Sequence, residues 1–164
     1  MENQTRQFNT DEAYDRFTAL MASSGLREAL AYLLKLSDYR YIAIFRFQNG
    51  KANAAVYYDR DNPAVLRAEE VPESATYCGF VRDGKRLFAT ANALQDPRLA
   101  GHPARATVLA YCGLPILDSG GQFLGTLCHY DLVPRDPEQL DLDLLLRVAS
   151  LLWQGNHVPP YPAV

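Results

Sequence analysis

Three cysteines, Cys78, Cys112 and Cys128, carry the most reactive side chains in this chain of 164 residues. Their number is odd and no two form a Cys-x-x-Cys pair, so their spacing indicates neither a disulfide framework nor a common zinc site. We therefore predict reduced, buried thiols, because free cysteine behaves as a small apolar residue. The alternative is a reactive thiol, which needs nearby positive charge and access to solvent.

Two of these cysteines lie in a predicted β-hairpin. Residues 111–131 form two apolar runs around the turn 118–121, whose Asp and Gly residues favour hairpin turns. A two-residue turn would place Cys112 opposite Leu127, and the thiols of Cys112 and Cys128 would point to opposite faces, which excludes a disulfide between them. A three-residue turn would oppose the two thiols directly.

In the two-residue register, one face of the hairpin is apolar apart from a single histidine. Its members are Cys112, Leu114, Ile116, Phe123, Gly125, Leu127 and His129. His129 is the sharpest candidate for a pocket donor, an acceptor or a haem ligand; the alternative is a core histidine bonded to a backbone carbonyl. His102 lies in a Gly-His-Pro loop, where we expect exposure.

Asp96 and Arg98 are candidates for binding a polar ligand. The alternative is structural: Asp96 precedes a proline and caps a helix, while Arg98 pairs with an acid or a carbonyl. Tyr57, Tyr77 and Tyr111 suit a pocket wall, although tyrosine is also common in half-exposed strands. No nucleophile has an identifiable base, so the sequence indicates no catalytic residue, and we expect a role other than catalysis.

The charge of the chain argues against two classes of partner. Sixteen basic and nineteen acidic residues give a net charge of −3, without a run of Lys or Arg, so we expect no binding to nucleic acid or to anionic membranes. The amino terminus lacks the features of a signal peptide, and no apolar run reaches the roughly 18 residues of a membrane helix. We therefore expect a cytoplasmic protein.

Periodicity predicts helices near both ends of the chain and strands between them. The predicted helices are 10–21 with a Thr cap, 26–36 as a separate helix or as the continuation of a kinked one, short helices at 74–81, after Asp96 and at 103–109, and 137–153 with Asp136 as its cap. The predicted strands are 39–47 and 52–58 around the hairpin signal Asn49-Gly50, then 87–90 and the hairpin 111–131; residues 60–73 read as a loop.

This order indicates an α+β domain with a central antiparallel sheet of five to six strands. Helices from both ends cover one face, and the irregular central segments are left to cover the other. We expect one domain over residues 11–155, between a flexible segment at 1–10 and a tail at 156–164.

Three segments in this order resemble GAF domains, which are small sensory modules. The Gly-x-Pro strand, Asp/Gly turn and Gly-Thr-Leu-Cys strand within 111–131 are similar to the closing hairpin of that family. Tyr77-Cys78-Gly79-Phe80 and residues 88–99 resemble its Cys-containing helix, third strand and Asp-Pro-Arg turn, and Pro134-Arg135-Asp136 its link into the last helix. The resemblance extends from about Leu26 to Trp153.

The resemblance implies a ligand pocket on the sheet face away from the terminal helices, roofed by loops and short helices, and a homodimer paired through the terminal helices. The candidate ligand-binding residues are Tyr57, Tyr77, Cys78, Asp96, Arg98, His102, Tyr111, Cys112 and His129. No cofactor or metal is predicted. Residues 97–110 hold no cysteine for a bilin, Cys128-His129 falls in the last strand, and a haem would need His129 as its ligand.

The resemblance thus predicts a module that binds a small molecule and signals through a partner protein or through dimer contacts. Two alternatives stay open at this point. One is a thiol-based redox enzyme or sensor of the free methionine sulfoxide reductase type, suggested by the three cysteines. The other is a structural dimerisation module, suggested by the apolar terminal helices.

Overall fold

A computed structural model describes residues 8–162, so the predicted flexible segment at 1–10 lies mostly outside the described residues. The helices are α1 (Thr10–Ser24), α2 (Leu26–Lys35), α3 (Cys78–Gly84) and α4 (Leu142–Gln154). The strands are β1 (Tyr41–Gln48), β2 (Lys51–Asp59), β3 (Val71–Pro72), β4 (Phe88–Thr90), β5 (Ala110–Leu117) and β6 (Phe123–Asp131).

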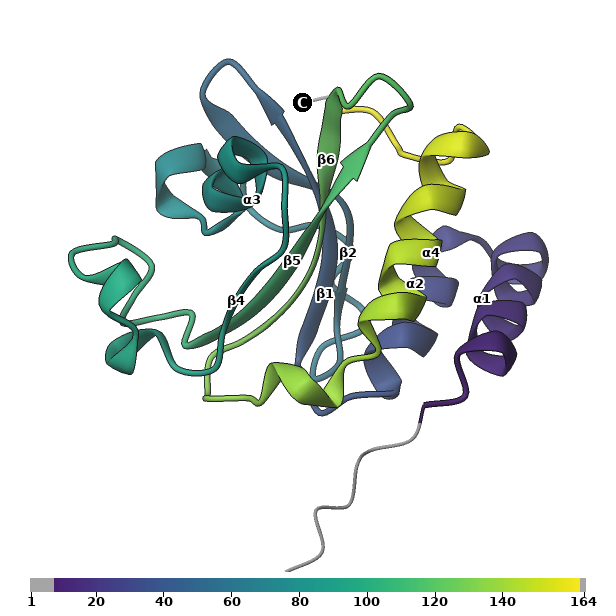
Figure 1. Ribbon diagram of the computed structural model, residues 1–164, viewed down its shortest axis with the longest axis horizontal. Coiled ribbons are helices and arrows are strands. Elements are labelled where there is room, and N and C mark those ends of the chain that lie inside the picture. Colours follow the sequence, from purple (N-terminus) through teal and green to yellow (C-terminus); the bar gives the residue numbers. More distant parts are fainter. Residues whose placement is uncertain (1–7, 163–164) are drawn as a thin grey trace, which may run out of the picture.

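The strands form one antiparallel sheet in the order β3-β2-β1-β6-β5-β4 (Figure 1). The predicted α+β fold with five to six strands is confirmed. β1 and β2 are joined at Asn49-Gly50, where both residues have positive φ, as a tight hairpin turn requires. The short strand β3 lies within the predicted loop 60–73, because two residues give no periodicity to detect.

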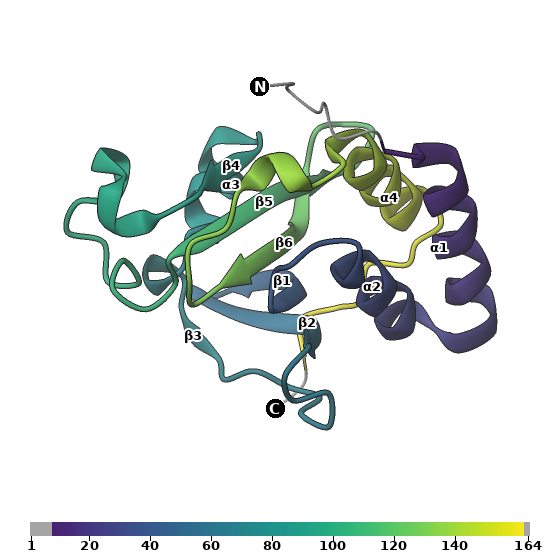
Figure 2. The ribbon, with the colours of Figure 1, turned by 90° about the horizontal axis from the view of Figure 1, so that it is seen from below.

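Helices and central segments lie on opposite faces of the sheet (Figure 2). α2 and α4 pack on one face, and α1 packs outside them against both helices. Each face has its own buried cluster: Phe17, Leu30, Leu34 and Val148 belong to the helical side, whereas Tyr77, Val81 and Leu99 belong to the other. The second cluster surrounds the candidate site.

The helix starts differ from the sequence prediction in two places, and one alternative that the sequence left open is decided. The amino-terminal helical region is two helices, broken at Gly25 with φ +93°, and Asn9 rather than Thr10 caps α1. The predicted helix 137–153 is a 3₁₀ turn capped by Asp136, followed by α4, which begins after its own cap Asp141. At α1 and α4 a second acceptor side chain near the helix start, Asn9 and Asp141, took the capping role.

The central short helices also differ. Residues 73–75 form a 3₁₀ turn and α3 begins only at Cys78, so Ser74 does not cap it. The predicted helix 103–109 is wrong: separate turns close there, with the amides of Arg105 and Thr107 bonded to carbonyls three residues earlier. A proline at 103 and a preceding glycine with φ +78° hold this segment as a loop.

The predicted hairpin register is wrong. Cys112 pairs with His129, not with Leu127, and a bulge follows Ile116. The carboxylate of Asp118 accepts the amides of Gly120 and Gln122 at 2.9 and 2.8 Å and thereby holds a wider loop than two residues. The bulge moves Phe123 to the other face, but the two thiols still point to opposite faces, as predicted.

Candidate ligand-binding site

A cavity of about 260 Å³ lies on the sheet face away from α2 and α4, where the family resemblance implied a pocket. β1, β5 and β6 form one side, and residues 68–71, the start of α3 and the loop 104–108 form the other. The lining residues are Phe45, Ala68, Glu69, Val71, Ala75, Thr76, Tyr77, Cys78, Ala104, Val108, Tyr111 and Tyr130.

Aromatic rings dominate the walls of this cavity. Tyr77 meets Tyr111 edge to face with ring centroids 5.5 Å apart, and Tyr130 stacks on Tyr41 at 4.7 Å. Among the lining residues only Glu69 carries a formal charge. The cavity therefore favours a ligand with a large apolar part, and it offers no cation for an anionic group.

The sulfur of Cys78 accepts two hydrogen bonds at the cavity wall. The hydroxyls of Tyr111 and Thr126 donate to it at 3.1 and 3.3 Å. Burial opposes ionisation, but hydrogen bonds from Cys128, Thr126 and Tyr111 outweigh it and lower the pKa of the Cys78 thiol below its ordinary value. The thiolate form is thus stabilised by hydrogen bonds and not by a nearby cation.

Gly113 lets Tyr111 reach this sulfur. The Tyr111 ring lies along β5 over Gly113, where an added Cβ would be 2.2 Å from the tyrosine hydroxyl. Burial raises the pKa of Tyr111 well above its ordinary value, so the hydroxyl keeps its proton and donates. Glycine is therefore required at this position of the Gly-x-Pro strand, because a side chain there would displace the Tyr111 ring.

Tyr77 fixes the loop above the cavity. Its hydroxyl donates to the carbonyl of Val108 at 2.8 Å, and its ring lies against His102 with centroids 4.7 Å apart. Burial raises the pKa of Tyr77 to about 12, so this donor also keeps its proton at neutral pH. One side chain next to α3 thus joins the loop 102–108 to the cavity wall.

Of the nine predicted site residues, the structure brings three into the cavity: Tyr77, Cys78 and Tyr111. Tyr57 is one ring away, since it lies 6.0 Å from Tyr41, which stacks on a lining residue. His102 is half-buried, where we predicted exposure, and lines a neighbouring hollow with Phe80.

Asp96 and Arg98 lie outside the cavity and make the structural contacts that were the alternative interpretation. The Asp96 carboxylate accepts the Arg98 amide at 3.0 Å, and Arg98 donates to Asp96 and to the carbonyl of Ala89, both at 2.6 Å. The Arg98 guanidinium lowers the pKa of Asp96 to about 2. The Asp96 carboxylate and the Arg98 guanidinium therefore form an ion pair with each other and do not face a ligand site.

Cys112 and His129 lie in the core on the helical face, opposite the cavity. Burial lowers the pKa of His129 to about 3, so the imidazole is neutral at physiological pH. Its Nδ1 has no hydrogen-bond partner within residues 8–162, so the predicted bond to a backbone carbonyl is not made at this atom. Tyr39 packs edge to face against the ring at 5.7 Å.

The lining residues that sequence reasoning missed come mainly from irregular segments. Ala68, Glu69, Ala104 and Val108 lie in loops that carry no periodicity. Tyr130 could have been identified from the sequence as a lining residue, because it lies two residues after Cys128 in β6 and therefore on the same face of the strand.

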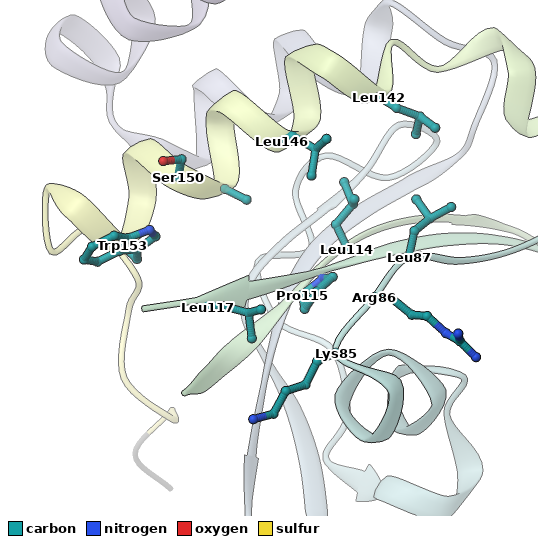
Figure 3. Close-up of a pocket in the computed structure, with 11 residues that line it drawn as sticks. Lys85, Arg86, Leu87, Leu114, Pro115, Leu117, Leu142, Leu146, Ser150 and Trp153 are labelled. Carbon is teal, nitrogen blue, oxygen red and sulfur yellow. The ribbon is translucent and has the colours of Figure 1, made fainter. Parts of the chain in front are cut away.

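A second hollow of about 360 Å³ lies on the helical side, between α4 and the edge of β5 (Figure 3). Leu146 of α4 and Leu114 of β5 point toward each other across it, with Leu142 and Leu87 beside them. Its polar residues, Lys85, Arg86 and Ser150, make no buried polar cluster. We therefore regard it as a surface groove and the aromatic cavity as the candidate site.

Two kinds of feature are absent from residues 8–162. No group of three or more His, Cys, Asp or Glu side chains is placed to hold a metal ion in this part of the chain. The same residues contain no helix with the length and apolar character needed to cross a membrane.

Together these features are those of an α+β domain with the GAF fold, as the resemblance predicted. Similar solved structures include the GAF domain of an Acinetobacter phosphoenolpyruvate-protein phosphotransferase, with TM-score 0.68 and 14% identity over 90% of this chain and 92% of that one. Another is the free methionine-R-sulfoxide reductase of Neisseria meningitidis with its substrate, with TM-score 0.67 and 16% identity over 88% and 86% of the two chains. Identities this low define the fold alone.

Sequence comparison adds one relative and no family match. No protein-family model matches the chain. It is 30% identical to a cyclic di-GMP phosphodiesterase of Pseudomonas aeruginosa over 96 residues, which cover 56% of this chain. The aligned part spans only 16% of that enzyme's length.

Proposed function

We propose that this protein is a sensory module that binds a small molecule in the aromatic cavity. The single observation that carries the proposal is the cavity itself, placed between the sheet and the central segments and lined by four aromatic rings. Proteins bind small molecules in concave, mostly apolar sites with a few fixed polar groups. The GAF-fold neighbours support the same reading.

The lining chemistry limits the class of ligand. The cavity is slightly smaller than the about 300–1,000 Å³ of common ligand pockets, and Glu69 is its single charged lining residue. We infer an uncharged or cationic ligand with an apolar body. Cyclic di-GMP, which the name of the Pseudomonas relative includes, carries phosphates for which the lining residues offer no cation.

Thermal melting in the presence of candidate metabolites tests the proposal. A ligand at a hundred times its dissociation constant adds about 2.7 kcal/mol of stability. Ala104→Phe would fill the cavity from its roof and should abolish the shift, whereas Ala106→Phe, at an exposed position two residues on, should keep it. A shift of equal size in both variants would place the ligand elsewhere.

We also propose that the module acts through contacts of its terminal helices with a second copy. α4 leaves Leu142 and Leu146 exposed at 40% and 55% beside the groove of Figure 3. Lys85 and Arg86 border this groove, so an apolar strip with a basic rim is available to a second copy. Through such a contact, a structural change caused by ligand binding is transmitted to the second copy.

Sedimentation equilibrium tests the second copy. The wild-type protein should dimerise with rising concentration, and Leu146→Glu should remain monomeric. Leu94→Glu is the matched control, because Leu94 is exposed to a similar degree (47%) outside the groove. A wild-type protein that stays monomeric at high concentration would remove this part of the proposal.

A second candidate function is a thiol-based redox enzyme of the free methionine sulfoxide reductase type, which the placement of Cys78 in the cavity favours. The Neisseria neighbour is a free methionine-R-sulfoxide reductase by name. Turnover of free methionine sulfoxide by the wild-type protein, lost in Cys78→Ser and kept in Cys112→Ser, would support it. Turnover unchanged in Cys78→Ser, or absent throughout, would eliminate it.

A further inference from the structure

The fold brings together two thiols that lie 50 positions apart in the sequence (128 − 78 = 50). Cys78 is the first residue of α3, and Cys128 lies in β6 two residues after Thr126, on the same face of the strand. Since the hydroxyls of Thr126 and Tyr111 both reach the Cys78 sulfur, that sulfur lies over the sheet beside Cys128.

The hairpin places Cys128 next to the groups that hold the Cys78 sulfur. The Tyr111 hydroxyl, which donates to that sulfur at 3.1 Å, lies over Gly113, and Gly113 pairs with Cys128 across the hairpin. The Cys128 thiol itself donates to the carbonyl of Ala43 at 3.7 Å. The two thiols therefore belong to one buried cluster on the cavity side of the sheet.

Both thiols are buried, with 1% and 0% of the residue exposed, but only Cys78 lines the cavity. A small molecule in the cavity therefore meets the sulfur of Cys78 first, and Cys128 lies behind it.

Cys112 provides an internal comparison. It lies on the helical face, where burial raises the pKa of its thiol to about 12. A thiol in that state is inert toward mild oxidants. The three cysteines of the chain are therefore chemically distinct.

We propose that Cys78 is an oxidation site for a small hydroperoxide that enters the cavity, and that Cys128 then closes a disulfide with it. This inference concerns covalent modification, and it requires neither binding of a reversible ligand nor catalytic turnover.

The reaction balances in two steps. The Cys78 thiolate attacks one peroxide oxygen, so that an S–O bond forms, the O–O bond breaks, and the leaving alkoxide or hydroxide takes a proton. The Cys128 sulfur then attacks Cys78, the S–S bond forms, and water leaves with the Cys128 proton. Two thiols are oxidised by two electrons, and the hydroperoxide is reduced to an alcohol, or to water, plus water.

Intact-mass and peptide mapping of the reduced full chain, treated with hydrogen peroxide or tert-butyl hydroperoxide, test the inference. We expect the loss of two hydrogens and a Cys78–Cys128 peptide in the wild-type protein and in Cys112→Ser. In Cys128→Ser, dimedone should trap a sulfenic acid at Cys78, and Cys78→Ser should show neither product. Circular dichroism checks that each variant is folded.

Tyr111→Phe separates a specific role of the hydrogen bonds from simple proximity. Removing this donor should raise the apparent pKa of the rate profile and slow oxidation at neutral pH by about three- to tenfold, because a rise in pKa reduces the thiolate fraction more than it increases nucleophilicity. A folded wild-type protein that forms no Cys78–Cys128 disulfide, or that is oxidised equally fast at Cys112, would overturn the inference. Both outcomes leave reversible ligand binding untouched.

Discussion

At the scale of the residue, the shape of the cavity depends on side chains whose positions are fixed by hydrogen bonds and close packing. Tyr111 keeps its proton, lies over a glycine and donates to Cys78, while Tyr77 holds the loop above. On the opposite face His129 is neutral and buried, with the Tyr39 ring against its imidazole. Two side chains that looked alike as pocket candidates in the sequence, Cys78 and Cys112, therefore have different environments.

Gly113→Ala should destabilise the protein by about 1–3 kcal/mol, the usual cost of overpacking a core. The new Cβ would meet the buried Tyr111 ring, which must move away from Cys78. Gly120→Ala in the same hairpin is the control, because its nearest neighbour would be 3.4 Å away. Urea unfolding measures both, and equal stability of the two variants would contradict the steric argument.

His129 should make stability depend on pH. Its pKa is about 3 in the folded chain against an ordinary value of 6.5, so between these values the unfolded chain binds a proton that the folded chain does not. Stability is fully present above pH 6.5 and should fall toward pH 3 by up to about 1.4 kcal/mol per pH unit.

His129→Phe should remove this part of the slope, and His157→Gln, at an exposed position, should keep it. The measurement is the free energy of unfolding in urea at several pH values. Identical slopes for the wild-type protein and His129→Phe would show that the histidine does not titrate as stated.

At the scale of the element, one carboxylate fixes the end of β6. Asp131 is buried and accepts the backbone amides of Arg40 and Leu132 at 3.0 and 2.7 Å and the Arg135 side chain at 2.8 Å. It thus ties the start of β1, the end of β6 and the link toward α4 together. This pairing keeps β1 and β6 adjacent in the middle of the sheet.

Asp131→Ala should lower the free energy of unfolding by about 1–3 kcal/mol, because it leaves two backbone amides and the half-buried Arg135 guanidinium without their buried acceptor. Asp83→Ala is the control, since Asp83 is exposed and pairs only with its neighbour Arg82. Exposed pairs of this kind contribute about 0–1 kcal/mol. Equal losses in both variants would contradict the assignment.

At the scale of the whole molecule, the tail after α4 connects the helical side with the cavity wall. Arg46 of β1 donates to the carbonyl of Pro159 at 2.9 Å, and the Tyr161 hydroxyl donates to Glu70. Prolines of the tail and residues 66–70 line the same hollow, and residue 68 also lines the cavity. A displacement of the cavity wall is therefore transmitted, through these contacts, to the segment that follows α4.

Ending the chain after Gly155 should lower the melting temperature and increase hydrogen exchange at residues 66–71, because these contacts are lost. Ending it after Pro162 should change neither, since the described contacts of the tail lie before that point. Unchanged exchange at residues 66–71 in the shorter chain would show that the tail does not support the cavity wall.

The sequence by itself determined the α+β architecture, the two hairpins, the buried reduced state of the cysteines and the GAF-like order of elements. Each of these follows from local signals: apolar periodicity, Asn49-Gly50 and the Gly-x-Pro strand. Tertiary structure alone decided which residues meet. Cys78 and Cys128 lie on the cavity side and Cys112 on the helical side, because α3 packs on β5 and β6 on one face while the terminal helices cover the other, and loops without periodicity supply half of the cavity wall.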